Sequence, residues 1–219
     1  MAKSAKTKSL RSKAYEEIKT RILFNDFKPG EKLFESDLAE SLKISRTPVR
    51  EALLILEKDR LVEFDDRLGF MVRRLRPEEI DEYFNIRELL EFYAVPLILD
   101  QINPDEIQAL EDNIREAESY LERNDLRSII RCNIEFHEII WNSPKSNIFF
   151  QIITNLSNMF LWYRAIAFID PKDVENSIAD HKELLSAIKA KDIEGLKKSI
   201  KRHLGNARAG NKALHAFLR

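Results

Sequence analysis

The sequence predicts a mainly α-helical protein in which three helices and a β-hairpin are followed by an antiparallel bundle of six or seven helices. The 219 residues include only five glycines and seven prolines, and residues that favour helices dominate the rest. A strand-like pattern occurs only before residue 75, and the chain beyond it reads as helices. We expect a flexible basic arm over residues 1–13, a first domain over residues 14–75 and a second over residues 76–219.

Charge is divided unevenly between the two predicted domains. Residues 1–76 contain 18 Lys and Arg against 13 Asp and Glu, a net charge of +5, while residues 77–219 contain 18 against 24, a net charge of −6. The first 13 residues hold five cations and no acid. This asymmetry favours a polyanionic partner at the front of the chain only, although a solvated tail is the alternative for the first residues.

The sequence contains no candidate for a membrane span or a signal peptide. The longest apolar run, Tyr93 to Leu99, is too short to cross a bilayer, and no apolar segment follows the N-terminal lysines. We therefore expect a cytoplasmic protein without a membrane partner. The single cysteine, Cys132, can form no internal disulfide, which suits a reducing compartment, and we expect it to be buried in a helix.

Three helices are predicted in the first domain. Residues 12–24 carry apolar side chains at helical spacing, and a Pro-Gly pair then stops the helix. Ser36 is expected to cap the second helix, and Thr47 to start the third, with Pro48 at its first position. Two short helices joined by a tight turn match helix-turn-helix geometry.

Arg46 and Arg50 fall outside the apolar stripe of the third helix and are predicted to face outward from its first turns. In helix-turn-helix proteins this end enters the major groove, where arginine pairs with guanine edges. Two β-prone runs follow at residues 61–64 and 70–72, and they predict a wing with Arg67 at its tip. Arg67 could reach phosphate or a narrow minor groove, and a solvated surface arginine is the equal alternative.

The stretch "LFESDLAESLKISRTPVREALLILEKDRLVEF" resembles the winged helix-turn-helix of the GntR family of bacterial transcription regulators. Its typical pattern contains L-x-E-x-x-L-A and S-R-T-P-V-R-E-A-L, and the resemblance covers about the first third of the chain. Ser36 stands where many members have arginine, and Asp66 where many have a second wing glycine. The resemblance implies base contacts from Arg46 and Arg50, phosphate contacts from Ser45 and Thr47, and an approach of the wing backbone to DNA at Gly69.

From Pro77 onward, four helices are expected to begin at proline. The segments "RPEEI", "NPDEI", "SPKSN" and "DPKDV" each place proline where the first helical residue belongs. Further helices are expected at residues 125–141 and 192–217, and a break of the last at Gly205 or Gly210 would give seven instead of six. Residues 148–168 are apolar on several faces, as expected of a central buried helix.

Three of the four histidines, His137, His181 and His203, lie on three different predicted helices with apolar neighbours at helical spacing. Asn133 shares a helix face with His137, one turn earlier. Imidazoles that converge in a bundle core suit a divalent ion, most naturally Zn²⁺ and otherwise Ni²⁺ or another borderline ion. From spacing alone, unrelated core histidines are the favoured alternative, and His215 is expected to be solvated.

Residues 77–214 resemble the FCD effector domain of the FadR-like branch of the GntR family, in which a D-x-x-x-H motif and two later histidines hold a metal beneath a small-acid effector. The segments "NIEFH", "DHKELLSAI" and "KRHL" carry this resemblance, which implies Asn133, His137, His181 and His203 as metal ligands. Asn133 stands where the family usually has aspartate. Because an amide oxygen is a neutral and weaker donor than a carboxylate, we expect looser metal retention and a stronger pull on an anionic effector.

Arg87 is the first candidate ligand for the effector. It lies on the inward stripe of the helix that begins at Pro77, and a guanidinium facing a core needs a carboxylate nearby. That carboxylate belongs either to the effector or to Glu91 one turn later. Asn155 and Arg164, the polar members of the apolar segment, are further candidates to contact the effector from a position that faces the core. For Asn155, a hydrogen bond satisfied within the core is the favoured alternative.

These features predict a transcription regulator that responds to a ligand. The family resemblance implies a repressor, because repression relieved by a ligand is the commoner mode in that family. A homodimer would place two winged helices on inverted-repeat operator DNA, and a small carboxylate in the helical domain would change their placement. We expect no enzymatic activity, because no carboxylate is clearly placed as a general base. The alternatives are a helical metalloenzyme fused to a DNA-targeting module and a constitutive DNA-binding protein whose bundle only dimerises.

Overall fold

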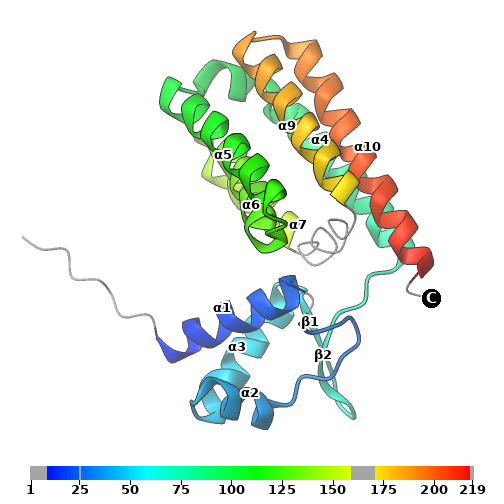
Figure 1. Ribbon diagram of the computed structural model, residues 1–219. Helices are drawn as coiled ribbons and strands as arrows, with labels where there is room; N and C mark the ends of the chain where they lie inside the picture. Colours follow the sequence, from blue (N-terminus) through cyan, green and yellow to red (C-terminus); the bar gives the residue numbers. More distant parts are fainter. Residues whose placement is uncertain (1–8, 25, 159–170, 218–219) are drawn as a thin grey trace, which may run out of the picture. The chain divides into compact units, whose positions relative to one another are not determined.

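The computed structural model describes residues 9–24, 26–158 and 171–217 and divides the chain into two compact units, Met1–Arg74 and Leu75–Arg219 (Figure 1). Each unit has its own apolar core. The regular elements are helices apart from one small sheet in the first unit, which confirms the mainly α-helical class. Among the described helices, none combines the length and the apolar character needed to cross a membrane.

Three helices form the first unit: α1 (Leu10–Leu23), α2 (Glu35–Leu42) and α3 (Arg46–Lys58). α1 packs against α3, and Ile18 and Ile22 of α1 are buried with Leu53 and Leu56 of α3. α2 ends at Lys43, whose left-handed φ of 55° turns the chain sharply into α3. The predicted helix-turn-helix is therefore present.

Two helix starts in this unit differ from the prediction. Ser36 is not a cap, because it is the second residue of α2 and Phe34 occupies the N-cap position. α3 begins at Arg46 after the N-cap Ser45, so Pro48 lies at the third helical position. Proline is tolerated there because the first four N–H groups of a helix have no intrahelical partner. The sequence thus predicted this helix correctly but placed its first residue two positions too late.

A β-hairpin follows α3. β1 (Val62–Asp65) pairs with β2 (Gly69–Val72) in antiparallel register, with Phe64 opposite Phe70. The edge of β2 is covered by the segment after α1, where the N–H of Leu33 donates to the carbonyl of Phe70 at 2.8 Å. The wing is thus confirmed, and the segment predicted only as a helix stop also contributes to its sheet.

Six helices of the second unit lie within the described residues (Figure 1): α4 (Pro77–Gln101), α5 (Pro104–Glu122), α6 (Leu126–Asn142), α7 (Asn147–Asn158), α9 (Pro171–Lys189) and α10 (Ile193–Phe217). α5 packs against α6 and α9, and α10 packs against α9 and α4. The α5–α6 and α9–α10 connections are three residues long, so these pairs run antiparallel. α10 continues without a break through Gly205 and Gly210.

The prediction that a helix begins at each of four prolines is wrong for one of them. Pro144 lies in the turn after α6, and α7 begins only at Asn147. The other three prolines each occupy the first position of a helix, as predicted: Pro77, Pro104 and Pro171. A proline in a tight turn satisfies the same restriction of φ as one at a helix start, so the sequence pattern did not separate the two.

α7 is not a central buried helix. Phe149 and Ile153 are buried on one of its faces, whereas Ile148 is 73% and Ile152 is 49% exposed. The predicted helix over residues 148–168 extends into residues 159–170, which lie outside the described residues. Within the described part, the expectation of burial on several faces is wrong, because α7 covers the bundle with one face and leaves the other open.

We predict that Leu53→Ala will lower the free energy of unfolding of the first unit by about 2–5 kcal/mol, because Leu53 is fully buried and its truncation leaves a cavity between α1 and α3. Leu54→Ala is the matched control, since Leu54 is 47% exposed on the same helix and should cost less than about 1 kcal/mol. Urea unfolding of both variants, followed by circular dichroism, measures the difference. Equal losses would contradict this packing.

Candidate functional site

The N-terminal end of α3 presents the residues predicted to contact DNA. Ser45 is the N-cap, and its side chain makes no capping hydrogen bond. The side chains of Ser45, Arg46, Thr47 and Arg50 are all exposed. A helix N-terminus attracts phosphate through its unpaired N–H groups, and adjacent guanidinium groups can pair with guanine edges. The first turn of α3 therefore has the chemistry of a DNA-reading surface.

Arg50 is paired with a carboxylate of the preceding helix. Its Nη1 donates to Oε1 of Glu35 at 2.8 Å, while the Arg50 side chain remains 56% exposed. An exposed pair of this kind adds little to stability, but it does set the direction of the guanidinium. Glu35 was not predicted as a site residue, although it is the glutamate of the L-x-E-x-x-L-A pattern.

The wing turn is built by one carboxylate and one glycine. Asp65 accepts hydrogen bonds from the backbone N–H groups of Arg67 and Leu68 at 2.8 and 2.9 Å. Gly69 has a φ of +77°, and a Cβ added there would meet no atom of the protein. Glycine is thus needed for its left-handed backbone and not for lack of space, and the turn leaves Arg67 exposed at the tip of the wing.

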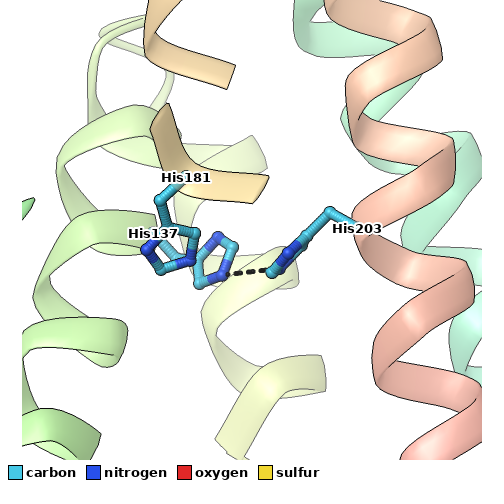
Figure 2. A group of neighbouring side chains, drawn as sticks. All are labelled: His137, His181 and His203. Carbon is cyan, nitrogen blue, oxygen red and sulfur yellow. Dashed lines mark hydrogen bonds between the residues drawn. The ribbon is translucent and has the colours of Figure 1, made fainter. Parts of the chain in front are cut away.

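Three histidines converge in the second unit. Figure 2 shows the rings of His137 from α6, His181 from α9 and His203 from α10 turned toward one another. Each offers one nitrogen within 4.8 Å of the others, and the Nε2 atoms of His137 and His203 are 3.2 Å apart. All three are buried. They form one cluster in the core of the second unit.

Asn133 lies at the edge of this histidine cluster. Its Nδ2 is 3.3 Å from Nε2 of His181 and donates to Oγ of Ser177 at 3.2 Å. Rotating the amide by 180° would exchange its nitrogen for its oxygen at the same place. The Asn133 oxygen can therefore reach the position that a carboxylate would take in an Asp-x-x-x-His motif.

One pair of nitrogens in the cluster has the spacing that a divalent ion requires. Two nitrogens bound at roughly 2.0–2.1 Å to one tetrahedral ion lie about 3.3 Å apart, close to the 3.2 Å between His137 and His203. Burial lowers the pKa of His203, even though the nearby Asp180 acts in the opposite direction, so the neutral imidazole that metals require is favoured. Two neutral imidazoles could also share a hydrogen bond at this distance, and metal content separates the two arrangements.

Asp180 lies next to the Nδ1 atom of His203. Its Oδ2 is 3.5 Å from Nδ1 of His203, a mainly electrostatic contact at that length. Oδ1 accepts a hydrogen bond from Arg202 at 3.0 Å, and Oδ2 accepts one from Asn206 at 2.9 Å. Burial opposes ionisation of Asp180, but His203, Asn206 and Arg202 outweigh it and lower the carboxyl pKa. The carboxylate favours a proton on Nδ1 and leaves Nε2 free to bind metal. Asp180 directly precedes His181, yet no spacing rule pointed to it.

Arg87 is buried beside the histidine cluster. Its Nε donates to Oε1 of Glu91 at 2.6 Å, and its Nη2 lies 3.3 Å from Nδ1 of His137. The guanidinium carbon also stands 5.1 Å from the centre of the Trp141 ring. Burial disfavours the charge, but Glu91 compensates and the pKa of Arg87 is raised overall. Of the two carboxylates that the sequence allowed beside Arg87, the internal one, Glu91, is therefore present. Another edge of the guanidinium faces the histidine cluster.

Of the two remaining candidate effector ligands, the structure describes Asn155, which is not brought to this site. Asn155 is exposed on α7, so its predicted position facing the core is wrong. Its place follows from the rotation of α7, which buries Ile153 and turns the residue two positions later outward. Arg164 lies outside the described residues.

Two family models match the chain. "Bacterial regulatory proteins, gntR family" matches residues 10–72 and "FCD domain" matches residues 82–206. The uncharacterized HTH-type transcriptional regulator YdhC of Bacillus subtilis (strain 168) is 31% identical over 193 residues, which cover 88% of this chain and 86% of YdhC. The gluconate operon transcriptional repressor of Bacillus licheniformis is 29% identical over 190 residues, 84% of this chain and 77% of the repressor.

The HTH-type transcriptional regulator McbR of Escherichia coli (strain K12) is similar in both sequence and structure. It is 30% identical over 192 residues, 85% of this chain and 86% of McbR. The solved structure of E. coli McbR/YncC matches with a TM-score of 0.85 and 27% identity, covering 95% of this chain and 100% of that one. These relatives are transcription regulators and not enzymes. With one family model spanning more than half of its length and YdhC aligned over most of both chains, the protein belongs to the GntR family of bacterial transcription regulators and carries an FCD domain.

Proposed function

We propose that the protein is a ligand-responsive repressor, which binds an inverted-repeat operator as a homodimer and responds to a small carboxylate held in its FCD domain. One observation carries this proposal: exposed arginines at a helix end in the first unit occur together with a buried cationic and histidine-rich site in the second. DNA contact and ligand contact then belong to different units. A ligand can alter DNA binding only if it favours one arrangement of the units over another.

On the DNA side, Arg46 and Arg50 are proposed to read base edges, with Ser45 and Thr47 on the phosphates and Arg67 of the wing in the minor groove. Two copies related by a two-fold axis would address two half-sites about one helical turn apart. The gluconate operon relative is a repressor by name, which supports the same sign of control here. A regulator of this kind acts on cytoplasmic DNA.

On the ligand side, His137, His181 and His203 are proposed to hold a divalent ion with the help of the Asn133 oxygen. Zn²⁺ is the first choice for such a nitrogen-rich set, and Ni²⁺ is the second. An ion held here would supply positive charge to an anionic ligand. Since Asn133 brings no charge, these four residues leave about +2 on the ion, where an aspartate would leave about +1.

Arg87 is proposed to hold the carboxylate of the effector. It is already charged and buried, and its Nη2 reaches the side of His137 while Glu91 holds its Nε. A guanidinium positioned by one carboxylate in this way can present its other edge to a second one with little loss of side-chain entropy. The remaining alternative is a constitutive DNA-binding protein, for which the FCD domain would only dimerise.

The first prediction from the proposed function concerns Arg50. Arg50→Ala should weaken binding to an operator selected from random DNA by about 1–3 kcal/mol and relax the base preference, because a base contact is lost. Lys58→Ala, at the opposite end of α3, is the matched control with one exposed cation removed. Fluorescence anisotropy with the selected and a scrambled duplex measures both effects. Unchanged affinity and selectivity in Arg50→Ala would refute a reading role.

The second prediction concerns the metal. His203→Ala should abolish retention of zinc, and Asp180→Asn should weaken it by roughly 10–100-fold, since the orienting carboxylate is lost. Glu183→Gln is the control, because Glu183 is an exposed carboxylate on the same helix that also pairs with Arg202. Zinc is measured by mass spectrometry and by competition with a chelator. Equal metal content in all three variants would show that the ligand set is wrong.

The third prediction concerns the effector. A panel of small carboxylates should include at least one that weakens operator binding by the wild-type chain in a mobility-shift titration. The double variant Arg87→Met/Glu91→Gln, which removes both charges of the buried pair together, should keep its metal and its DNA binding but lose this response. A retained response would exclude Arg87 as the effector ligand. No response to any carboxylate in the wild type would favour the constitutive alternative.

A further inference from the structure

We propose that Arg87 decides which ring nitrogen of His137 carries the proton, and that a divalent ion therefore competes with Arg87 for His137. When the ion binds, Nη2 of Arg87 is released for the carboxylate of the effector. This inference rests on the metal and the effector of the proposed function. It gives Arg87 a second role at the same site, as a positioning residue that couples the two ligands.

The contact between Arg87 and His137 has only one possible direction. Nη2 of Arg87 lies 3.3 Å from Nδ1 of His137, and both residues are 2% exposed. A guanidinium has five N–H donors and no acceptor, so Nδ1 must accept the hydrogen bond with its lone pair. A neutral imidazole then carries its one proton on the other nitrogen. His137 therefore has its proton on Nε2 for as long as Arg87 holds Nδ1.

The contact between the two histidines agrees with this tautomer. Figure 2 marks it between His137 and His203, whose Nε2 atoms are 3.2 Å apart. Two imidazoles share a hydrogen bond only if one nitrogen donates and the other accepts. Since Nε2 of His137 donates, Nε2 of His203 accepts and the proton of His203 belongs on Nδ1. Asp180 lies on that side of His203, with Oδ2 3.5 Å from Nδ1, and favours the same assignment.

These contacts form one chain of donors and acceptors across the bundle. It runs from Arg87 of α4 through His137 of α6 and His203 of α10 to Asp180 of α9. The chain begins at a group that can only donate and ends at a carboxylate that can only accept, so each ring nitrogen between them has one role. The two histidines consequently differ. His203 presents a lone pair to the cluster, whereas His137 presents an N–H.

A divalent ion needs the opposite tautomer of His137. An imidazole binds metal through a lone pair, and Nε2 is the nitrogen of His137 that faces His203. His137 offers this lone pair only after the proton on Nε2 has left for solvent and another has been taken up at Nδ1, so the ring stays neutral. Nδ1 and Nη2 of Arg87 are then two donors that face each other. Their hydrogen bond is lost, and Nη2 needs a new acceptor.

The rest of the guanidinium keeps its place when Nη2 is released. Its Nε donates to Oε1 of Glu91 at 2.6 Å, and its Nη1 donates to the hydroxyl oxygen of Tyr83 at 3.4 Å. Neither contact involves His137. A carboxylate that approaches Nη2 thus meets a donor that is already desolvated and directed. Ion and carboxylate therefore bind with positive coupling, and each raises the affinity for the other by the same factor.

The first test is the position of the proton on His137 in the full-length protein. Long-range proton–nitrogen NMR spectra of protein labelled only at histidine distinguish the two neutral tautomers, and His137→Gln identifies the signals of this ring. We expect the proton on Nε2 in the metal-free protein and on Nδ1 after zinc is added. A proton on Nδ1 of His137 in the metal-free protein would overturn the inference.

The second test is the affinity for zinc, measured by competition with a chelator. Arg87→Met/Glu91→Gln removes the donor to Nδ1 and leaves the net charge of the site unchanged, so zinc should bind about tenfold tighter. If Arg87 only supported the histidines, its loss would weaken zinc binding instead. Asp81→Asn/Arg208→Gln is the matched control, because it removes a partly exposed ion pair of α4 and should leave the affinity unchanged.

Weaker or equal zinc binding by the Arg87→Met/Glu91→Gln variant, with its helicity intact by circular dichroism, would contradict the competition. If this variant does not fold, the proton position on His137 in the wild type decides the question by itself.

The outcomes separate this inference from the proposed function. Zinc that binds without moving the proton of His137 would overturn the competition and leave the metal site in place. A protein that binds no zinc would overturn both, while operator binding and its dependence on Arg50 would still test the regulator. A proton that moves with zinc, in a protein whose operator binding no carboxylate alters, would support the competition and overturn only the proposed effector.

Discussion

The second unit is organised around a buried cation. A guanidinium with 2% exposure can stay in an apolar bundle only if other groups replace the water it loses, and Glu91 does this from one turn away on the same helix. The face of the Trp141 ring and a ring nitrogen of His137 cover further parts of Arg87. These contacts require α4 and α6 to present specific residues to each other. The packing of these two helices and the residues of the histidine cluster therefore cannot change independently. Replacing a single member would leave the others buried and unpaired.

The same residue type has opposite roles in the two units. Arg46 and Arg50 lie in water at a helix end, where a guanidinium keeps its hydration until a phosphate or a base replaces it. Arg87 lies in the core, where its hydration is already replaced by protein groups and a further anion would meet a positioned donor. Exposure thus separates the arginines that stay accessible to a large polyanion such as DNA from the arginine whose neighbours are side chains of its own unit. This division matches a regulator whose output and input belong to different units.

Local sequence signals predicted the elements well where a helix or turn is defined by neighbours in the chain. The helix-turn-helix, the wing and the histidine-bearing helices follow from apolar spacing and from turn residues such as Gly69. The same signals failed where a residue type suits two local structures. Pro144 belongs to a turn and not to a helix start. Phe34 and not Ser36 is the N-cap of α2, and Ser45 and not Thr47 is the N-cap of α3. The burial of α7 could not be read from its composition, because an uncharged helix suits a fully buried and a half-exposed position equally well.

The sequence by itself determined the class of the protein, the chemistry at the start of α3 and the residue types from which the buried site is made, because these depend on short-range order along the chain. Only the tertiary structure decided which side chains meet. It brought His137, His181 and His203 together across 66 residues of sequence, gave Arg87 its partner in Glu91 and placed Asp180 behind His203. It also turned Asn155 to the surface and left Leu89 and Tyr93 of α4 exposed. Such pairings depend on the rotation and separation of whole helices, which are set by the packing of many side chains at once and leave no fixed spacing in the sequence.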